Sequence, residues 1–490
     1  MTQTALLWQP AVAVLIPLGF ALFLGVGGKA VREKGSYLSV CALAASFLVL
    51  APLADDVWGG QVLTVNYPFL PPFGLSFQID QLSLAMAVLF QLLGAVAALY
   101  SVAVRPTGEA RRFQAAFLFV LACALGLVLA GDLLSLFLFF EAMSLAFFVL
   151  VIHRGDKPSV DATIKYLYMT VGGGVLYFAA LAAVFVSAGS FHWQEGGFLV
   201  PGPFLLPAFF GFAAAFALKS GLFPLHFWMA DVYGNAPVPA VVLSSMVLLK
   251  TGAYGMTRII HHVFGAELLL QQGWQQVLLS MAAFTILYGS VCAFSQRDLL
   301  RRLAYSSMAQ LGYVYLGIFL LTPAALVGSI YHIMSHAVLK GTMLVCAGEI
   351  VDQTGKRNVD QMAGIGWQLP LTMAAFSLAA LTVVGLPPLN VFISKWYLSV
   401  GALAAGQPLL VVLLLVSSIL NAAYFLPMVV TAFFGGEERH QKSLRCERLS
   451  WSTLLALVLL VAAGVVFALT PDNWPLRWAE GIATAFWPGK

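Results

Sequence analysis

Long apolar runs recur along almost the whole chain, and short polar stretches separate them. Each run is close to the ~20 apolar residues that a helix needs to cross the hydrocarbon core of a bilayer. The pattern therefore predicts fourteen transmembrane helices. The predicted spans are 5–27, 36–54, 79–103, 113–130, 132–153, 162–187, 204–228, 236–260, 275–294, 299–322, 326–350, 370–398, 408–434 and 451–470.

The composition agrees with an all-α polytopic membrane protein. Of the 490 residues, 61% are hydrophobic and 9% are charged, whereas an ordinary soluble chain carries roughly 25% charged residues. The five cysteines are scattered without a CxxC pair, so we expect neither a disulfide framework nor a metal site. No Gly-rich phosphate loop of the Walker or Rossmann type occurs, and we expect no cofactor and no nucleic-acid partner.

Lysine and arginine residues predict the sidedness of the helices. They gather in alternate loops such as 105–112, 297–302 and 437–448, while the opposite side, tails included, carries only Arg258, Arg477 and Lys490. Cytoplasmic loops of membrane proteins are enriched in these residues. The N-terminus lacks the basic region of a signal peptide and is expected to be a retained first span. We therefore expect both termini on the non-cytoplasmic side of a plasma or inner membrane.

Two of the predicted helices contain a break. Pro224 interrupts the seventh span just after Lys219, and Pro387 interrupts the twelfth. A proline inside a spanning helix frees a backbone carbonyl, which must find another partner or line a cavity. The two breaks are five spans apart, and an odd spacing inverts the second unit relative to the first. Two unrelated prolines are the alternative explanation.

The breaks suggest a division of the chain into four parts. These are 1–112 with helices 1 to 3, 113–260 as the first inverted repeat, 275–434 as the second inverted repeat, and 435–490 as a cytoplasmic loop, the last helix and a short tail. Each repeat would contain five helices, one of them broken.

Charged and titratable side chains inside the predicted spans are the candidate functional residues. They are Glu141, Lys219, Lys250, His332, His336, Lys340 and Lys395. A charge inside a spanning helix costs roughly 2.5–3.5 kcal/mol on insertion scales, so such residues usually face a polar interior. His332, His336 and Lys340 recur every four residues and therefore share one helical face. An acid, lysines and histidines can pass protons when waters join them, because imidazole titrates near neutral pH and burial disfavours a charged lysine.

Each of these residues also has a structural explanation. A lysine can extend its ammonium from a helix end to the membrane surface, which is the favoured interpretation for Lys165. Glu141 can neutralise a buried lysine, and a lone histidine in a span is more often a structural hydrogen-bonding group. Asp80 stands at the start of the third span and is expected to cap or anchor that helix rather than to conduct.

Seven segments carry a resemblance to a known family. They are IDQLSL at 79–84, FEAMSL at 140–145, ALKSGLFPLHFWMADVYGNAPVP at 217–239, LLKTGAYGMTRI at 248–259, YSSMAQLGY at 305–313, HIMSHAVLKG at 332–341 and GLPPLNVFISKW at 385–396. With these segments in this order, the chain resembles the antiporter-like membrane subunits shared by respiratory complex I, Mrp-type cation/proton antiporters and membrane-bound group 4 hydrogenases. The resemblance implies fourteen helices with two inverted five-helix repeats.

The resemblance also implies roles for the buried residues. Glu141 matches the family's acid and Lys219 its partner lysine, Lys250 matches the central lysine, His332, His336 and Lys340 lie on the segment that links the halves, and Lys395 matches the terminal basic residue. A proton would enter near Lys250 from the cytoplasm and leave near Lys395. One complex I subunit type usually has glutamate at the place of Lys395, and another has a long lateral helix after the last span, so both types are disfavoured.

The implied function leaves three hypotheses open. The first is a subunit that translocates protons, or sodium and protons, in a redox-driven complex such as NADH-quinone oxidoreductase or a membrane-bound hydrogenase. The second is the D-like subunit of a Mrp-type secondary sodium/proton antiporter. The third is a scaffold whose polar residues are inert. In each of them the expected partners are other membrane subunits and the lipid bilayer.

Overall fold

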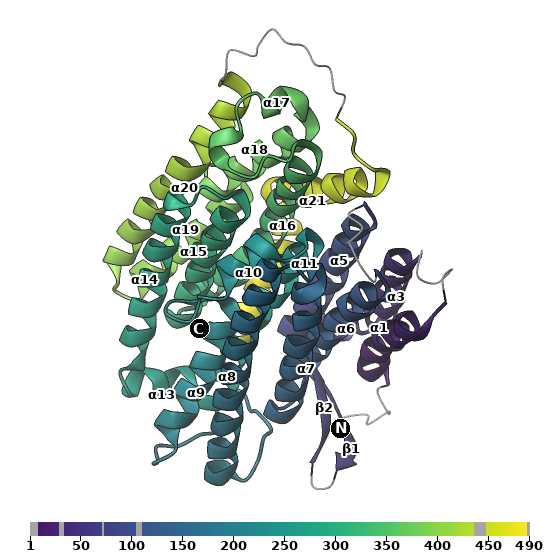
Figure 1. The fold of residues 1–490 in the computed structure, drawn as a ribbon. Coiled ribbons are helices and arrows are strands. Elements are labelled where there is room, and N and C mark those ends of the chain that lie inside the picture. Colours follow the sequence, from purple (N-terminus) through teal and green to yellow (C-terminus); the bar gives the residue numbers. More distant parts are fainter. Residues whose placement is uncertain (1–7, 29–33, 71–72, 104–109, 436–446, 488–490) are drawn as a thin grey trace.

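A computed structural model describes residues 8–28, 34–70, 73–103, 110–435 and 447–487, most of which are helical (Figure 1). Within these ranges, eleven helices are long and apolar enough to cross a membrane, and two further apolar helices are shorter. The chain is therefore a multi-pass membrane protein built mainly of helices, as the sequence predicts. Lys29, Lys490 and most of the loops 105–112 and 437–448 lie outside the described residues.

The N-terminal part contains three long helices and a hairpin. Its elements are α1 (Gln9–Val26), α3 (Gly35–Leu50), α4 (Ala54–Trp58), β1 (Leu63–Leu70), β2 (Phe73–Ile79) and α5 (Gln81–Ala103). In Figure 1 the purple helices α1 and α3 form one flank of the molecule.

The first broken helix and the helix that carries Lys250 lie in the next part of the chain. Its elements are α6 (Ala110–Leu129), α7 (Leu133–Val151), α8 (Lys157–Ala188), α9 (Leu205–Ser220), α10 (Met229–Asn235), α11 (Val238–Leu243), η3 (Ser244–Leu248), α12 (Leu249–Arg258) and η4 (Ile259–Phe264). The last four form one continuous spanning helix, in which η3 and η4 are π-helical.

The second broken helix lies in the last part of the chain. Its elements are α13 (Ala266–Gln271), α14 (Trp274–Ser295), α15 (Leu299–Phe319), α16 (Pro323–Thr354), α17 (Ile365–Gln368), α18 (Pro370–Val384), α19 (Asn390–Ala404), α20 (Pro408–Phe434), α21 (Trp451–Leu469) and α22 (Pro475–Phe486). Helices α14 and α20 form the flank opposite α1 and α3 (Figure 1).

Two helices form the centre of the bundle. In the most apolar stretch of each helix, all residues of α16 and 94% of those in the continuous helix Val238–Phe264 are buried. In α20 the buried share is only 28%. Large apolar side chains such as Leu415 and Ile419 are exposed on α20, as expected for a helix that faces lipid. The candidate residues on the two central helices are therefore shielded from both water and lipid by the surrounding helices.

Capping residues explain where several helices begin. Asp132 accepts a hydrogen bond from the Ser135 backbone N–H at 2.6 Å at the start of α7, and Asp298 accepts one from the Arg301 N–H at 2.9 Å at the start of α15. An aspartate at this position satisfies one of the free N–H groups of the first turn. The short Gly131–Asp132 junction is thus a genuine boundary between two spans.

Both predicted helix breaks are present. Helix α9 ends at Ser220 with Gly221 in the left-handed region (φ 69°), and α10 begins only at Met229. Helix α18 ends at Val384 with Gly385 also left-handed (φ 85°), and α19 begins at Asn390. A left-handed glycine is a common way to end a helix, and the prolines that follow each glycine prevent the helix from continuing.

The structure contains two elements that the sequence did not predict, a β-hairpin and a helix in the C-terminal tail. Strands β1 and β2 pair antiparallel from Leu63↔Ile79 to Leu70↔Phe73, and this hairpin projects from the end of the bundle opposite α17 (Figure 1). The C-terminal tail contains the helix α22, which packs against α16 and α5. The strands and α22 are all shorter than the ~20 residues of a membrane-spanning helix, so the pattern of long apolar runs does not reveal them.

Ionic contacts bring several of the predicted cytoplasmic segments together. Arg357 Nε is 2.5 Å from Asp298 Oδ2, and Arg301 NH2 is 3.3 Å from Asp231 Oδ1. Asp231 also pairs with Lys165, whose side chain is half exposed, as expected for a lysine at a membrane surface. The end of α16 and the starts of α15 and α10 therefore meet at one end of the bundle.

Candidate functional site

Lys219 occupies the last turn of α9, immediately before the first break. Its side chain is 2% exposed. The ammonium donates a hydrogen bond to Ser144 Oγ at 2.6 Å and lies 5.2 Å from the centroid of the Phe140 ring. The freed end of α9 thus directs a buried ammonium at the middle of α7.

Glu141 lies on α7 one turn before Ser144, but it makes no ion pair with Lys219 among the described residues. Its Oε1 has no hydrogen-bond partner within the same part of the chain, although its charge and that of Lys219 interact. Glu141 packs against α8, where a Cβ added to Gly174 would stand 2.5 Å from Glu141 Oε1. The predicted pair therefore exists as two neighbouring charges with Ser144 as the direct partner of the lysine.

Lys250 lies near the midpoint of the continuous helix Val238–Phe264 and is fully buried. Its ammonium donates to the backbone carbonyl of Ser245, inside the π-helical segment η3. Such segments are rare and often occur at functional sites. Helix α16 packs against α11 and η3 of the continuous helix, and Lys250 is near enough to His336 and Lys340 of α16 for their charges to interact.

The two histidines and the lysine of α16 share one face, as their spacing predicts, and all three are fully buried. The rings of His332 and His336 are nearly parallel, with centroids 6.0 Å apart. His332 Nδ1 lies 2.8 Å from Ser394 Oγ of α19. In the described ranges, neither ring nitrogen of His336 has a hydrogen-bond partner. Buried polar groups of this kind are normally satisfied by ordered water.

Lys395 reaches back across the second break. Its ammonium donates to the carbonyl of Val384 at 2.9 Å, which is the last residue of α18, and to Ser418 Oγ of α20 at 2.7 Å. It also lies 5.1 Å from the centroid of the Tyr313 ring. No carboxylate forms an ion pair with Lys395 within the part of the chain that the structure describes. The break therefore supplies the carbonyl that holds this charge.

A chain of side-chain hydrogen bonds connects Lys340 with the surroundings of Lys395. Its members in order are Ser306, Tyr424, Asn421, Tyr313 and Ser417. Lys340 donates to Ser306 Oγ at 2.7 Å, and the Tyr313 hydroxyl donates to Ser417 Oγ at 2.6 Å. Sequence reasoning missed this chain. Its signal was the polar residues spaced by three and four on α20, at 417, 421 and 424.

A shorter link joins the surroundings of Lys219 and Lys250. The Ser220 hydroxyl donates to the carbonyl of Leu249 at 3.0 Å and lies 2.8 Å from the Tyr315 hydroxyl. The candidate residues therefore form two neighbouring groups. Glu141 and Lys219 lie at the first break, and Lys250, His332, His336, Lys340 and Lys395 extend from the central helices to the second break.

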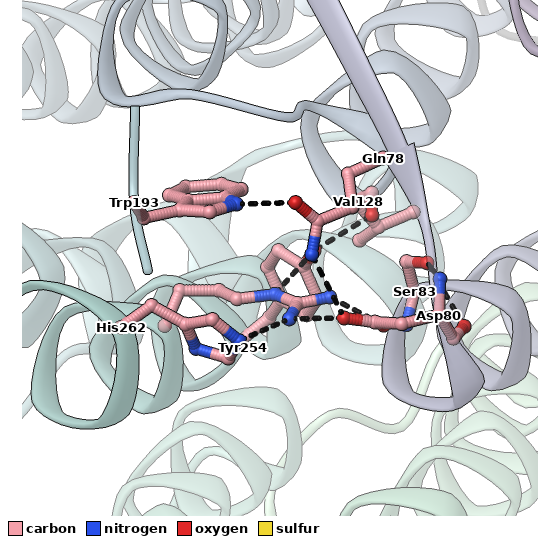
Figure 2. Close-up of polar contacts among 8 residues, drawn as sticks. Gln78, Asp80, Ser83, Val128, Trp193, Tyr254 and His262 are labelled. Atoms are coloured by element: carbon pink, nitrogen blue, oxygen red, sulfur yellow. Dashed lines mark hydrogen bonds and ion pairs between the residues drawn. The ribbon is translucent and has the colours of Figure 1, made fainter. Parts of the chain in front are cut away.

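The position of Arg258 differs from the predicted one, because the sequence places this charge in a loop. It was expected on the non-cytoplasmic side outside the membrane, but it is fully buried inside a spanning helix, where it forms a two-point ion pair with Asp80 (Figure 2). Charges near the ends of spans are difficult to assign from sequence, because a buried partner from another helix can hold them in the membrane. The expected anchoring role of Asp80 agrees with this pair and with its bonds to Ser83.

Comparisons with known proteins agree with the fold and with the segments that carry the resemblance. Residues 130–421 match the family described as NADH:quinone oxidoreductase/Mrp antiporter, TM. NADH-quinone oxidoreductase subunit N of Desulforudis audaxviator (strain MP104C) is 36% identical over 453 residues, which are 90% of this chain and 89% of the relative. Hydrogenase-4 component B of Escherichia coli (strain K12) is 28% identical, covering 98% of this chain and 74% of the relative.

A solved structure shows the same fold. A chain of the Mrp complex from Dietzia sp. DQ12-45-1b superposes with a TM-score of 0.87 at 21% identity, covering 99% of this chain and 98% of that chain. The matched residues 130–421 include all seven candidate site residues and both helix breaks, and they make up more than half of the chain. The chain belongs to the NADH:quinone oxidoreductase/Mrp antiporter family of transmembrane proteins.

Proposed function

We propose that this chain is an antiporter-like subunit that translocates protons, or sodium ions and protons, within a multisubunit membrane complex. The observation that carries the proposal is a series of buried lysines and histidines that extends from the first helix break to the second, at Lys219, Lys250, His336, Lys340 and Lys395. Burying an ammonium is costly unless the charge is used or compensated. Here the lysines are held mainly by hydroxyl groups and backbone carbonyls, which tolerate both the charged and the neutral amine.

In the proposed mechanism, a proton from the cytoplasm reaches Lys250. It passes to Lys340 and the histidines of α16, and then toward Lys395. Two routes are available between Lys340 and Lys395. One follows the parallel rings of His336 and His332, with bridging water, and the other follows the hydroxyl chain through Tyr424. Imidazole and hydroxyl groups both accept and donate protons, so the histidine route can carry a proton along the middle of the bundle. The chain through Tyr424 also needs a bridging water between the Tyr424 and Tyr313 hydroxyls, because the Asn421 amide that joins them does not relay protons.

In this mechanism, the separation of Glu141 and Lys219 determines whether Lys219 keeps its proton. A carboxylate near an ammonium favours the charged lysine, and separation of the two charges favours release of the proton. In the described arrangement the ammonium contacts Ser144 rather than Glu141. We interpret this as the separated form of the pair. Closing the pair would hold a proton on Lys219, and opening it would make that proton available to Lys250.

The proposed topology has fourteen spans. To the eleven helices that are long and apolar enough, we add α15 and the two interrupted pairs α9–α10 and α18–α19. The breaks follow the same order in both halves, with a left-handed glycine, one or two prolines and then a second helix. This similarity supports inverted five-helix repeats over 113–260 and 275–434. Both termini would lie outside the cytoplasm, in the inner or plasma membrane.

Glu141 also supports the presence of membrane partners. Its side chain is only partly buried within this chain, although its Oε1 atom is enclosed. A carboxylate in the hydrocarbon region is not tolerated toward lipid and normally faces protein or a water-filled cavity. We therefore expect a neighbouring membrane subunit to cover this position.

We favour coupling to a redox module over the D-like subunit of a Mrp-type secondary antiporter. The relative at 36% identity is named a NADH-quinone oxidoreductase subunit, and the hydrogenase relative also belongs by name to a redox enzyme. The driving reaction would take place on other subunits of the complex.

The proposal is tested by purifying the chain with its native partners and reconstituting the complex in sealed vesicles. Redox subunits should co-purify, and adding their electron donor and acceptor should generate a proton gradient. Lys250→Ala should abolish the gradient while the complex still assembles and its redox subunits still turn over. Isolation with small antiporter subunits alone would support the Mrp-type alternative, and a normal gradient in the Lys250→Ala complex would support the inert scaffold.

A further inference from the structure

A line of polar side chains runs from Lys250 toward the hairpin end of the bundle. Lys250, Tyr254, Arg258 and His262 recur every four residues and therefore lie on one face of the continuous helix. All four are at least 95% buried. Arg258 lies two turns beyond Lys250, or about 12 Å along the helix axis. Polar groups thus extend from the middle of the membrane almost to the end of this helix at Phe264.

Arg258 contacts four side chains, Asp80, Tyr254, His262 and Trp193, all of which are labelled in Figure 2. Its two terminal nitrogens donate to the carboxylate of Asp80 at 2.5 and 2.6 Å. Its Nε donates to the Tyr254 hydroxyl at 2.9 Å, and one terminal nitrogen lies 3.3 Å from His262 Nε2. The guanidinium carbon lies 5.7 Å from the Trp193 ring centroid and 5.1 Å from that of Tyr254. The side chain is fully buried, so these contacts leave it without access to solvent.

Asp80 is fixed by a second set of contacts. Its Oδ1 accepts a hydrogen bond from the Ser83 backbone N–H at 2.9 Å, and its Oδ2 accepts one from Gln78 Nε2 at 3.4 Å. Gln78 in turn accepts a hydrogen bond from the Trp193 indole at 3.0 Å. The hairpin, the start of α5 and the segment around Trp193 therefore meet at the ion pair.

The C-terminal helix covers the last residues of the line. The Phe486 ring lies 4.7 Å from the ring of His261 and 5.2 Å from that of His262, and the Trp487 ring lies 4.9 Å from that of His261. Aromatic side chains thus pack on the far side of the ion pair from Lys250. Among the described residues, the polar line therefore ends against aromatic rings, and Asp80 beside it keeps 16% of its side-chain surface exposed.

The chemistry of arginine gives the ion pair a specific consequence. A proton relay needs groups that accept a proton on one side and donate one on the other. A neutral lysine, a tyrosine hydroxyl and an imidazole can do both, whereas arginine has no acceptor atom and keeps its proton in proteins. Arg258 is the member of the line that cannot relay. Its bonds to Asp80 also keep it in place, because separating a buried ion pair is strongly unfavourable.

We propose that the Asp80–Arg258 pair is an insulating block that prevents protons on the central axis from leaving at the hairpin end of the first half. This inference rests on the proposed function, since it assumes that Lys250 carries protons. It gives a role to a buried ion pair that lies outside the proposed proton path from Lys250 to Lys395. Release would then be confined to the second half, at Lys395.

The test compares passive proton leak through the reconstituted complex without electron donor. The double variant Asp80→Asn/Arg258→His replaces the block with an imidazole that can relay. Its leak should rise by about tenfold, which corresponds to a barrier lower by about 1.4 kcal/mol. The matched variant Asp80→Asn/Arg258→Met removes the same ion pair but supplies no relay group, and its leak should stay near the wild-type value.

A second control uses the ion pair at the other end of the bundle. Asp298→Asn/Arg357→His removes a carboxylate–guanidinium pair that is more exposed than Asp80–Arg258 and lies off the polar line, and it should not raise the leak. A wild-type leak in the assembled Arg258→His double variant would overturn the proposal, as would equal leaks in the His and Met variants, which would indicate loosened packing. The leak needs no redox turnover, so these outcomes are distinguishable from failure of driven transport at Lys250.

Discussion

The buried lysines differ in their partners, and this difference decides what each can do. Lys219 lies near a carboxylate, whereas the polar contacts of Lys395 among the described residues are two backbone carbonyls and a hydroxyl, beside an aromatic ring. Desolvation without a compensating anion penalises the charged form of an amine. In the proposed mechanism, the absence of an ion-pair partner among the described residues suits Lys395 to the exit of the path.

The first prediction concerns this exit. Lys395→Met should abolish net proton translocation in sealed vesicles, because the remaining groups cannot pass the proton beyond the second break. Lys395→Glu should retain part of the activity, since a carboxyl group can also carry a proton. Pumping at the wild-type rate by the Met variant would instead support a lysine that merely extends toward the membrane surface.

The second prediction concerns the charges at the first break. Glu141→Gln and Lys219→Ala should each abolish or strongly reduce ion movement while the complex still assembles. Glu141→Asp and Lys219→Arg should keep part of it, because they preserve the signs of the charges. Assembly is measured by co-purification and transport by acidification of vesicles. Loss of assembly in the first two variants would indicate an ion pair with a purely structural role.

The third prediction concerns the histidines of α16. Replacing His332 or His336 with glutamine should slow transport to an extent that depends on pH, because imidazole is the side chain whose charge changes near neutral pH. The transport rate is measured from about pH 6 to 8 in wild type and variant. A loss of equal size at every pH would point to disturbed packing of the two parallel rings.

At the scale of elements, the sequence predicts what depends on local pattern. The apolar runs locate the spans, the prolines locate the two breaks, and the four-residue spacing locates the shared face of His332 and His336. The position of Arg258 and the contact of Lys219 with Ser144 could not be predicted, because they depend on how separate helices pack. The hairpin and α22 were missed because both lie outside the long apolar runs.

The hydroxyl chain joins α16, α15 and α20, and it leads to the fourth prediction. Tyr424→Phe removes the hydroxyl between Ser306 and Asn421 while keeping the volume of the ring. Transport should fall by severalfold if protons use this chain, with little change in thermal stability beyond the roughly 1 kcal/mol of a lost hydrogen bond. Tyr331→Phe, which removes a buried hydroxyl bonded elsewhere, to the Phe467 carbonyl, is the matched control. Equal rates in wild type and Tyr424→Phe would leave the histidines as the route.

At the scale of the whole molecule, the fifth prediction tests the sidedness. Arg297 is predicted to be cytoplasmic, and its side chain is 84% exposed, whereas the neighbouring Leu300 is buried and unsuitable as a reporter. In a cysteine-free background, Arg297→Cys should resist an impermeant thiol reagent added outside intact cells. Gln61→Cys, exposed between α4 and the hairpin, should react. The reverse pattern would place the termini in the cytoplasm.

The contacts of Lys395 also link its charge to the geometry of the bundle. Through its ammonium it connects the end of α18, the beginning of α19 and the middle of α20. An ammonium donates stronger hydrogen bonds than a neutral amine, so in the proposed mechanism each proton that leaves Lys395 weakens a side-chain connection across the second break. The angle between α18 and α19 should then vary with every transport cycle. A subunit packed against these helices would experience ion release as a mechanical displacement.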